Sequence, residues 1–168
     1  MKSDIKSSEI KNNYKSLIRY STDRINTEEK KQIKKAFEKA FLAHQGVKRK
    51  SGKEYILHPL SVAKIVAKEI GLGATAIICA LLHDVVEDSE TELKEIENEF
   101  GKKVANIIDG LTKIEEVVDN ATSIQAENFR KMLLTLSDDI NVILIKLADR
   151  LDNMRTLEFL EDRKRKKI

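Results

Sequence analysis

The segment ATAIICALLHDVVEDSE (residues 74–90) begins as an almost uninterrupted apolar run and then presents one histidine and three acids within six positions. If this segment forms a helix, apolar residues lie on nearly all sides of it, which is typical of a helix buried in a protein core. We therefore predict one buried helix over residues 74–87. An unpaired buried charge is strongly destabilising, so the histidine and the acids require a cation or hydrogen-bonding partners.

The composition predicts an all-α fold with one hydrophobic core. The chain has 168 residues, of which 41% are hydrophobic and 35% are charged, with six glycines and one proline. This length suits one domain, and the scarcity of turn-forming residues favours helices over strands. We expect a helical bundle of seven or eight helices without a convincing strand.

Other features exclude several classes of protein. The apolar run is far shorter than the roughly 20 residues that span a membrane, and charges throughout the N-terminal segment exclude a signal peptide. Cys79 is the single cysteine, which excludes an internal disulfide, and its apolar surroundings indicate a buried side chain rather than a reactive thiol. We expect a cytoplasmic protein that has no membrane partner.

Charge gives no argument for nucleic acid. The 31 basic residues are nearly balanced by 28 acidic ones, for a net charge of +3. Basic residues cluster in KRKSGK (48–53) and RKRKK (163–167), and a solvated surface is the usual explanation for such runs. We expect no specific nucleic-acid partner.

Capping residues predict where the first helices begin and end. Asn26, followed three residues later by Glu29, has the spacing of a capping box and predicts a helix over residues 28–45. An apolar face between residues 10 and 18 predicts another helix before it. Pro59 suits the first position of a later helix that Gly71 ends.

The second half of the chain continues as helices. Ser89 and Glu92 fit the cap of a helix that Gly101 ends. Further helices are expected near residues 102–117, 123–137 and 139–159, with loops over residues 46–57 and 118–123. We divide the chain into an N-terminal helical extension (residues 1–26) and a main domain (residues 27–168). The last segment carries no helix stop signal, which leaves open whether the domain is truncated at its C-terminus.

The acids of the buried helix suggest a metal site. His83 and Glu87 are four residues apart, as are Asp84 and Asp88, so all four side chains can face one cleft. Two further segments supply compatible groups, and the predicted ligand set is His58, His83, Asp84 and Asp149. Nitrogen and oxygen ligands without thiolate suit manganese, iron, zinc or magnesium.

Several of these residues also have an ordinary structural explanation. His58 precedes a proline at a helix entrance and could cap the helix or lie at the surface. Asp149 could pair with Arg150 or Lys146, and Glu87 and Asp88 could be surface acids. The four candidate ligands together favour a metal.

A bound divalent metal would make this a hydrolytic site. It lowers the pKa of bound water from about 15.7 to near 7, and a carboxylate one turn away, such as Glu87 or Asp88, can orient the water or take its proton. The basic loop before His58 carries Lys48, Arg49, Lys50 and Lys53, and it favours an anionic substrate. Phosphate is the substrate chemistry that these residues indicate best.

These motifs resemble a known family. RKSGKEYILHP (49–59), HDVVED (83–88), AENFRKMLL (126–134) and LADRLDNMRT (147–156) are similar to the hydrolase half of RelA/SpoT homologues, an HD-domain family. The resemblance runs from about residue 28 to the end of the chain, and the four motifs together are specific to these proteins.

The resemblance implies an all-α HD-domain bundle that hydrolyses the alarmone (p)ppGpp at its 3′ position and releases pyrophosphate and GDP or GTP. It implies manganese (Mn2+) as the usual metal, held by the predicted ligand set. It assigns water activation to Glu87 and Asp88. It assigns nucleotide contacts to Arg49, Lys50, Ser51, Tyr55, Asn153 and Thr156. Tyr55 could equally be a core residue, whereas Asn153 and Thr156 follow Asp149 on one helical face.

One departure from the family pattern bears on activity. The family string R-L-H-N-M-R-T has Asp152 in place of its histidine here, and this carboxylate either weakens phosphate binding or lies outside the cleft. Two alternatives stay open: hydrolysis of another nucleotide, and a non-catalytic domain that binds alarmone and regulates a longer protein. The resident metal and the oligomeric state are also open.

Overall fold

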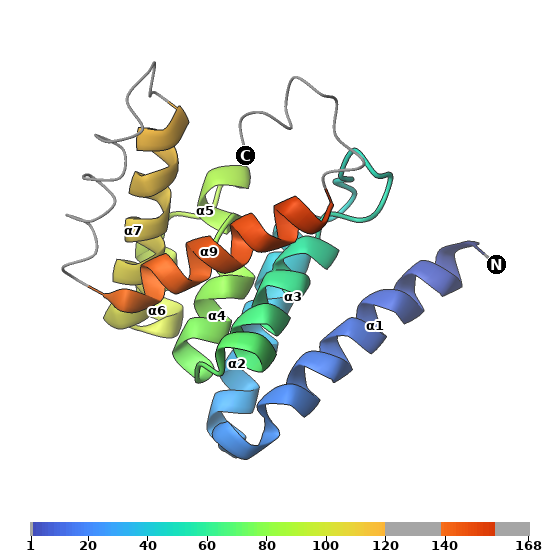
Figure 1. Cartoon of the computed structure of the whole chain (residues 1–168), viewed down its shortest axis with the longest axis horizontal. Helices are drawn as coiled ribbons and strands as arrows, with labels where there is room; N and C mark the ends of the chain where they lie inside the picture. Colours follow the sequence, from blue (N-terminus) through green and yellow to red (C-terminus); the bar gives the residue numbers. More distant parts are fainter. Residues whose placement is uncertain (1, 120–138, 157–168) are drawn as a thin grey trace.

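The computed structural model describes residues 2–119 and 139–156, and these form a helical bundle (Figure 1). The helices are α1 (Lys2–Ser21), α2 (Thr27–Ala43), α3 (Leu57–Lys64), α4 (Ala74–Leu82), α5 (Val85–Asp88), α6 (Leu93–Phe100), α7 (Lys102–Asp119) and α9 (Ile140–Arg155). Two short segments differ, the 3-10 helix η1 (Thr22–Arg24) and the π-helix η2 (Ile65–Ile70). The described residues contain no β-strand, only an isolated bridge between Lys48 and Glu54. The predicted all-α fold is confirmed.

Helix α4 is the centre of the core. It packs against α2, α3, α7 and α9, and all of its residues except Thr75 are buried. Cys79 is among the fully buried ones, and burial raises the pKa of its thiol above the usual range. The apolar character of residues 74–82 therefore predicted the position of this helix correctly.

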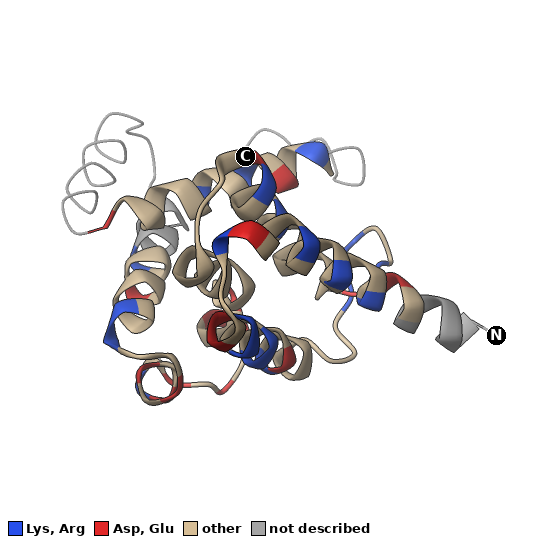
Figure 2. Cartoon of the chain, turned by 90° about the horizontal axis from the view of Figure 1, so that it is seen from below, with Lys and Arg blue, Asp and Glu red and all other residues tan. Residues whose placement is uncertain are grey.

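The N-terminal helix shares this core. Ile10 and Leu17 of α1 are buried, and α1 packs against α3 and η2. Charged residues lie on several helices with both signs mixed (Figure 2). Within the part of the chain that the structure describes, no helix has the length and apolarity needed to cross a membrane.

Two predicted helix ends are confirmed. The Asn26 side chain accepts a hydrogen bond from the Glu29 amide at 2.9 Å, and the Glu29 carboxylate accepts one from the Asn26 amide at 2.7 Å. This capping box begins α2. Gly71 ends η2 in the left-handed region at φ +84°, which glycine adopts without strain.

The predicted helix over residues 74–87 is wrong at one point, because α4 ends at Leu82 and α5 begins at Val85. Asp84 has φ −97° and ψ −5°, near the bridge region. The His83 Nδ1 atom lies 2.9 Å from the Ala80 carbonyl oxygen, which a continuous helix would offer to the Asp84 amide. The side chain thus competes with the helical hydrogen bond, and the chain turns at the two site residues.

Two other predicted boundaries are also wrong. Helix α3 begins at Leu57, two residues before Pro59, because a turn through Tyr55 runs directly into it. Proline is tolerated there, since amides in the first helical turn have no helical acceptor. Ser89 does not cap α6, whose N-cap residue is Glu92. The Ser89 hydroxyl instead donates a hydrogen bond to the Val85 carbonyl of α5 at 2.6 Å.

The last predicted elements are seen in part. Helix α7 extends to Asp119, into the expected loop, and α9 matches most of the helix predicted over residues 139–159. The predicted helix over residues 123–137, with the motif AENFRKMLL, and the terminal basic run lie outside the described residues.

Candidate metal and nucleotide site

The four predicted metal ligands come from three segments of the chain. His58 is in the first turn of α3, His83 and Asp84 form the turn between α4 and α5, and Asp149 lies in α9. The two histidines and Asp149 are buried, with exposed fractions of 4%, 4% and 6%. Packing of α3, α4 and α9 against one another brings these side chains together.

The donor atoms of this set face one point. His58 Nε2 lies 3.2 Å from Asp149 Oδ1 and 3.8 Å from Asp84 Oδ2. His83 Nε2 lies 3.1 Å from Asp84 Oδ1 and 3.9 Å from Asp149 Oδ1. Ligand atoms of His58, His83 and Asp84 all lie within 4.8 Å of one another. One divalent ion could therefore contact two imidazoles and two carboxylates here.

Hydrogen bonds on the far side of each ring orient the imidazoles. The Ala80 carbonyl can only accept a hydrogen bond, so His83 Nδ1 carries the proton and Nε2 presents its lone pair. His58 Nδ1 lies 2.6 Å from Asp152 Oδ2 and donates to it, which also directs Nε2 toward the acids. Such outer partners are typical of metal-binding histidines.

One buried atom of the set is left without a partner. His83 Nε2 is buried and forms no hydrogen bond with any residue of the described ranges. A lone pair that faces two carboxylates is destabilising unless a proton or a metal lies between them. The residues therefore fit a divalent metal, and three of them, His58, His83 and Asp84, form a His/Asp group that could hold one.

The electrostatics of the metal-free site also favour a cation. Burial would lower the pKa of His58, but hydrogen bonds to Asp149 and Asp152 outweigh it and raise the pKa to about 9. Burial would raise the pKa of Asp149, but the hydrogen bond from His58 and the positive charge of Lys146 hold it well below its usual range. The cluster therefore stabilises positive charge at its centre.

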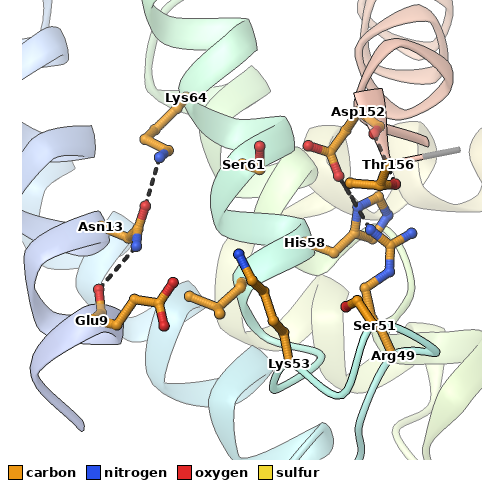
Figure 3. A pocket seen from close by; sticks show the side chains of 11 residues that line it. Glu9, Asn13, Arg49, Ser51, Lys53, His58, Ser61, Lys64, Asp152 and Thr156 are labelled. Carbon is orange, nitrogen blue, oxygen red and sulfur yellow. Dashed lines mark hydrogen bonds and ion pairs between the residues drawn. The ribbon is translucent and has the colours of Figure 1, made fainter. Parts of the chain in front are cut away.

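A cavity of about 180 Å³ opens beside His58 (Figure 3). Its inner wall includes Arg49, Ser51, Asp152 and Thr156. The other lining residues are Glu9 and Asn13 from α1, Lys53 from the loop before α3, and Leu57, Ser61 and Lys64 from α3. Three of the predicted nucleotide-binding residues, Arg49, Ser51 and Thr156, thus line one cavity next to the metal set.

The other predicted nucleotide-binding residues lie around this cavity in different ways. Asn153 accepts a hydrogen bond from Arg49 Nη2 at 2.6 Å and donates one to Asp149 Oδ1 at 2.8 Å, so it links the loop to the metal set. The Tyr55 hydroxyl donates to Asp84 Oδ2 at 2.7 Å, on the metal side. Lys50 is exposed and is absent from the cavity lining.

The two predicted water-activating acids follow the metal set in the chain and do not line this cavity. Glu87 and Asp88 are exposed on α5, directly after the turn at Asp84. Partial burial and the charge of Asp84 raise the pKa of Glu87. The contact with His44 lowers the pKa of Asp88. The two neighbouring carboxyl groups thus differ in how readily they take up a proton.

Three further side chains lie at or near the site, one of them as the sequence predicted and two not. Asp152 is buried within the site, so the alternative that it lies outside the cleft is wrong. The predicted pairing of Lys146 with Asp149 is confirmed, at 3.4 Å between Nζ and Oδ2. His44 was not considered, although it is one of only three histidines and follows directly after α2.

Comparisons with known proteins agree with this site. Residues 36–168 match the family described as HD domain, which is a hydrolase family. A relative from Aquifex aeolicus named guanosine-3′,5′-bis(diphosphate) 3′-pyrophosphohydrolase is 47% identical over 137 residues, which covers 82% of this chain and 19% of the relative. A relative from Streptomyces coelicolor named GTP pyrophosphokinase is 42% identical over 151 residues, which covers 90% of this chain and 18% of the relative.

A solved structure shares the arrangement of helices. It is described as "A metazoan ortholog of SpoT hydrolyzes ppGpp and plays a role in starvation responses", and it superposes with a TM-score of 0.63. The sequences are 26% identical, and the match covers 80% of this chain and 78% of that chain. The chain spans about a fifth of the length of these curated relatives. The family match over most of the sequence, together with a His/Asp cluster at the centre of an all-α bundle, shows that the chain belongs to the HD domain family.

Proposed function

We propose that this chain is a metal-dependent hydrolase that removes pyrophosphate from the 3′ position of (p)ppGpp and leaves GDP or GTP. The observation that carries this proposal is the convergence of His58, His83, Asp84 and Asp149 beside a cavity lined by Arg49. Water supplies the hydroxyl group that pyrophosphate takes, and the 3′ oxygen of the nucleotide leaves with a proton. The relatives and the solved structure whose names mention this reaction support the proposal.

The metal is proposed to be Mn2+, held by the two imidazoles and the two carboxylates. When bound, a divalent metal polarises a phosphate oxygen and lowers the pKa of water. Around it, Asp152 and the Ala80 carbonyl hold the imidazole rings in the orientation that exposes Nε2.

Glu87 and Asp88 are proposed to handle the proton of the attacking water. Because the pKa of Glu87 is raised, its carboxylate binds a proton more readily than an ordinary glutamate, which suits proton uptake during the reaction. Asp88, whose pKa is lowered, remains ionised and can orient the water through a carboxylate oxygen.

The nucleotide is proposed to bind along the cavity beside His58. Arg49, Lys53 and Lys64 line this cavity and would attract a polyanion. Ser51 and Thr156 add hydroxyl groups to this lining. Asn153 contacts Arg49, Tyr55 contacts Asp84, and Lys50 is exposed in the same loop as Arg49, so these three are proposed to contact the nucleotide from around the cavity. A cytoplasmic location stays a prediction.

A second candidate is a regulatory domain that binds the alarmone without hydrolysing it. The GTP pyrophosphokinase relative, named for synthesis of the nucleotide rather than for its hydrolysis, favours keeping this candidate. Tight binding of ppGpp without turnover under any divalent metal would identify it.

The deciding experiment is to incubate the purified chain with ppGpp and Mn2+, with and without a chelator, and to separate the products by ion exchange. We expect chelator-sensitive formation of GDP and pyrophosphate, and loss of it in His83→Ala. Leu42→Ala, at an exposed site on α2, serves as the surface control. Undiminished turnover in a folded His83→Ala variant would contradict the metal mechanism, and intact ppGpp with the metal-loaded wild type would contradict the function.

A further inference from the structure

His44 is a buried histidine that the proposed reaction does not use. It follows the last residue of α2, and its side chain is only 1% exposed. Helix α2 packs against both α4 and α5, so the ring lies behind the segment that carries the candidate catalytic acids. A buried imidazole in this position needs partners on both of its nitrogens.

Hydrogen bonding determines the protonation of one ring nitrogen. His44 Nδ1 lies 2.8 Å from the Ala40 carbonyl oxygen, which can only accept, so Nδ1 carries a proton. The other nitrogen, Nε2, faces Asp88 Oδ2 at 3.5 Å, an ion-pair distance. It is buried and has no hydrogen-bond partner among the described residues. A lone pair on Nε2 would face a carboxylate, so the contact is favourable only with a proton between the two groups.

A stacked aromatic ring also restricts the orientation of the His44 imidazole. Tyr55 stacks on it with ring centroids 4.6 Å apart and an interplanar angle of 16°. The same tyrosine donates its hydroxyl hydrogen bond to Asp84. The imidazole therefore cannot turn away from Asp88 without breaking this stack and the bond to Ala40.

Other charged groups near the ring are few in the described part of the chain. Asp84 contributes a favourable charge from behind Tyr55. The ring also borders an apolar cavity of about 320 Å³ whose lining includes Lys11 and Glu54. Within residues 2–119 and 139–156, the charged group at ion-pair distance from Nε2 is Asp88, whose own side chain keeps 45% exposure toward solvent.

We propose that His44 is a positioning residue, which donates a hydrogen bond from Nε2 to Asp88 and fixes this carboxylate for the hydrolysis step. The inference rests on the proposed function, because Asp88 matters only if the site is catalytic. His44 contacts one carboxylate oxygen from the protein interior and leaves the exposed side of Asp88 to water and substrate. Burial opposes the charge on the imidazole, yet Asp88 and the Ala40 carbonyl raise the pKa of His44.

Two substitutions separate positioning from packing. His44→Phe keeps a flat ring against Tyr55 but removes both nitrogens, and we expect kcat to fall about 10- to 100-fold, as for other outer-shell partners of a site. KM and metal affinity should change little, because the metal ligands stay in place. His44→Gln retains an amide donor near the position of Nε2 and should recover part of kcat. Gln45→Ala, the exposed neighbour on the same turn, is the matched control and should behave as wild type.

The double variant with Asp88→Asn tests the route of the effect. If His44 acts through Asp88, His44→Phe will lower kcat little further once Asp88 is replaced. Independent, multiplying losses would overturn the proposal, as would a His44→Phe variant with wild-type kcat. Equal losses in His44→Phe and His44→Gln, with lowered thermal stability in both, would show a packing role instead.

The protonation of His44 can also be measured by spectroscopy, independently of the hydrolytic activity. The chain has three histidines, so nitrogen NMR of the imidazole rings in the metal-free protein can be assigned by single substitutions. We expect His44 to carry protons on both nitrogens at neutral pH, and to lose the Nε2 proton in Asp88→Asn. An unprotonated Nε2 in the wild type would overturn the pairing even if ppGpp is hydrolysed. A confirmed pairing without any turnover would instead count against the proposed function alone.

Discussion

Nδ1 of His58 lies 2.6 Å from Oδ2 of Asp152, although 94 residues separate the two in the sequence. Both side chains are buried, and Asp152 also contacts Arg49 Nη1 at 3.4 Å. The residue that departs from the RelA/SpoT pattern is therefore bonded to a candidate metal ligand, and it joins that ligand to the candidate nucleotide loop. Its charge is partly offset by these two partners.

Removing this carboxylate should weaken metal binding. In Asp152→Ala the His58 ring loses the acceptor that orients it, and we expect about 10- to 100-fold lower metal affinity. Asp152→Asn keeps an acceptor oxygen and should lose less. Competition with a fluorescent chelator measures both, and an Asp152→Ala variant that binds metal as tightly as wild type would refute this orienting role.

The metal-free protein should lose stability as the pH rises through the range in which His58 titrates. The pKa of His58 is raised from 6.5 to about 9 in the folded chain, so folding favours its protonated form. This contribution is complete below pH 6.5 and disappears as the pH rises through about 9. At about 1.4 kcal/mol per pH unit, it amounts to at most about 3.5 kcal/mol. Urea unfolding in the presence of a chelator measures it, and His58→Gln should show a flatter pH dependence than wild type.

Arg49 should contribute more to substrate binding than its neighbour Lys50. Arg49 lines the cavity and is held there by Asn153, whereas Lys50 is exposed outside it. Losing a charge-assisted hydrogen bond to phosphate costs about 1.5–3 kcal/mol, so Arg49→Ala should raise KM for ppGpp about 10- to 100-fold. Lys50→Ala should raise it less. Steady-state kinetics compare the two, and a larger effect in Lys50→Ala would show that the substrate binds along the exposed loop.

Gly71 should be needed for its backbone conformation. It ends η2 at φ +84°, and a Cβ there would lie 3.2 Å from Arg24 Nη1, which donates to the Ala67 carbonyl at 2.8 Å. We expect Gly71→Ala to lower the free energy of unfolding by about 1 kcal/mol or more. Gly71→Asn meets the same arginine but tolerates positive φ better, so it should cost less. Equal losses in chemical denaturation would assign the effect to the contact with Arg24 rather than to the backbone.

Local patterns in the sequence predicted most of the fold. The capping box at Asn26, the left-handed glycine at Gly71 and the apolar run of α4 each depend on neighbours within a few residues. The break after Leu82 was not predicted, because it comes from a side chain bonding to its own helix. Helical periodicity contains no signal for that competition.

The sequence by itself determined the residue types of a metal site and the helices that carry them, since periodicity and capping are local properties. Only the tertiary structure decided which atoms meet. The contacts of His58 with Asp152 and of His44 with Asp88 join side chains from helices far apart in the chain. Their geometry follows from how α2, α3, α5 and α9 pack. Packing depends on side-chain shape across the whole core. The sequence alone therefore did not predict that Asp152, which departs from the family pattern, contacts His58 inside the site.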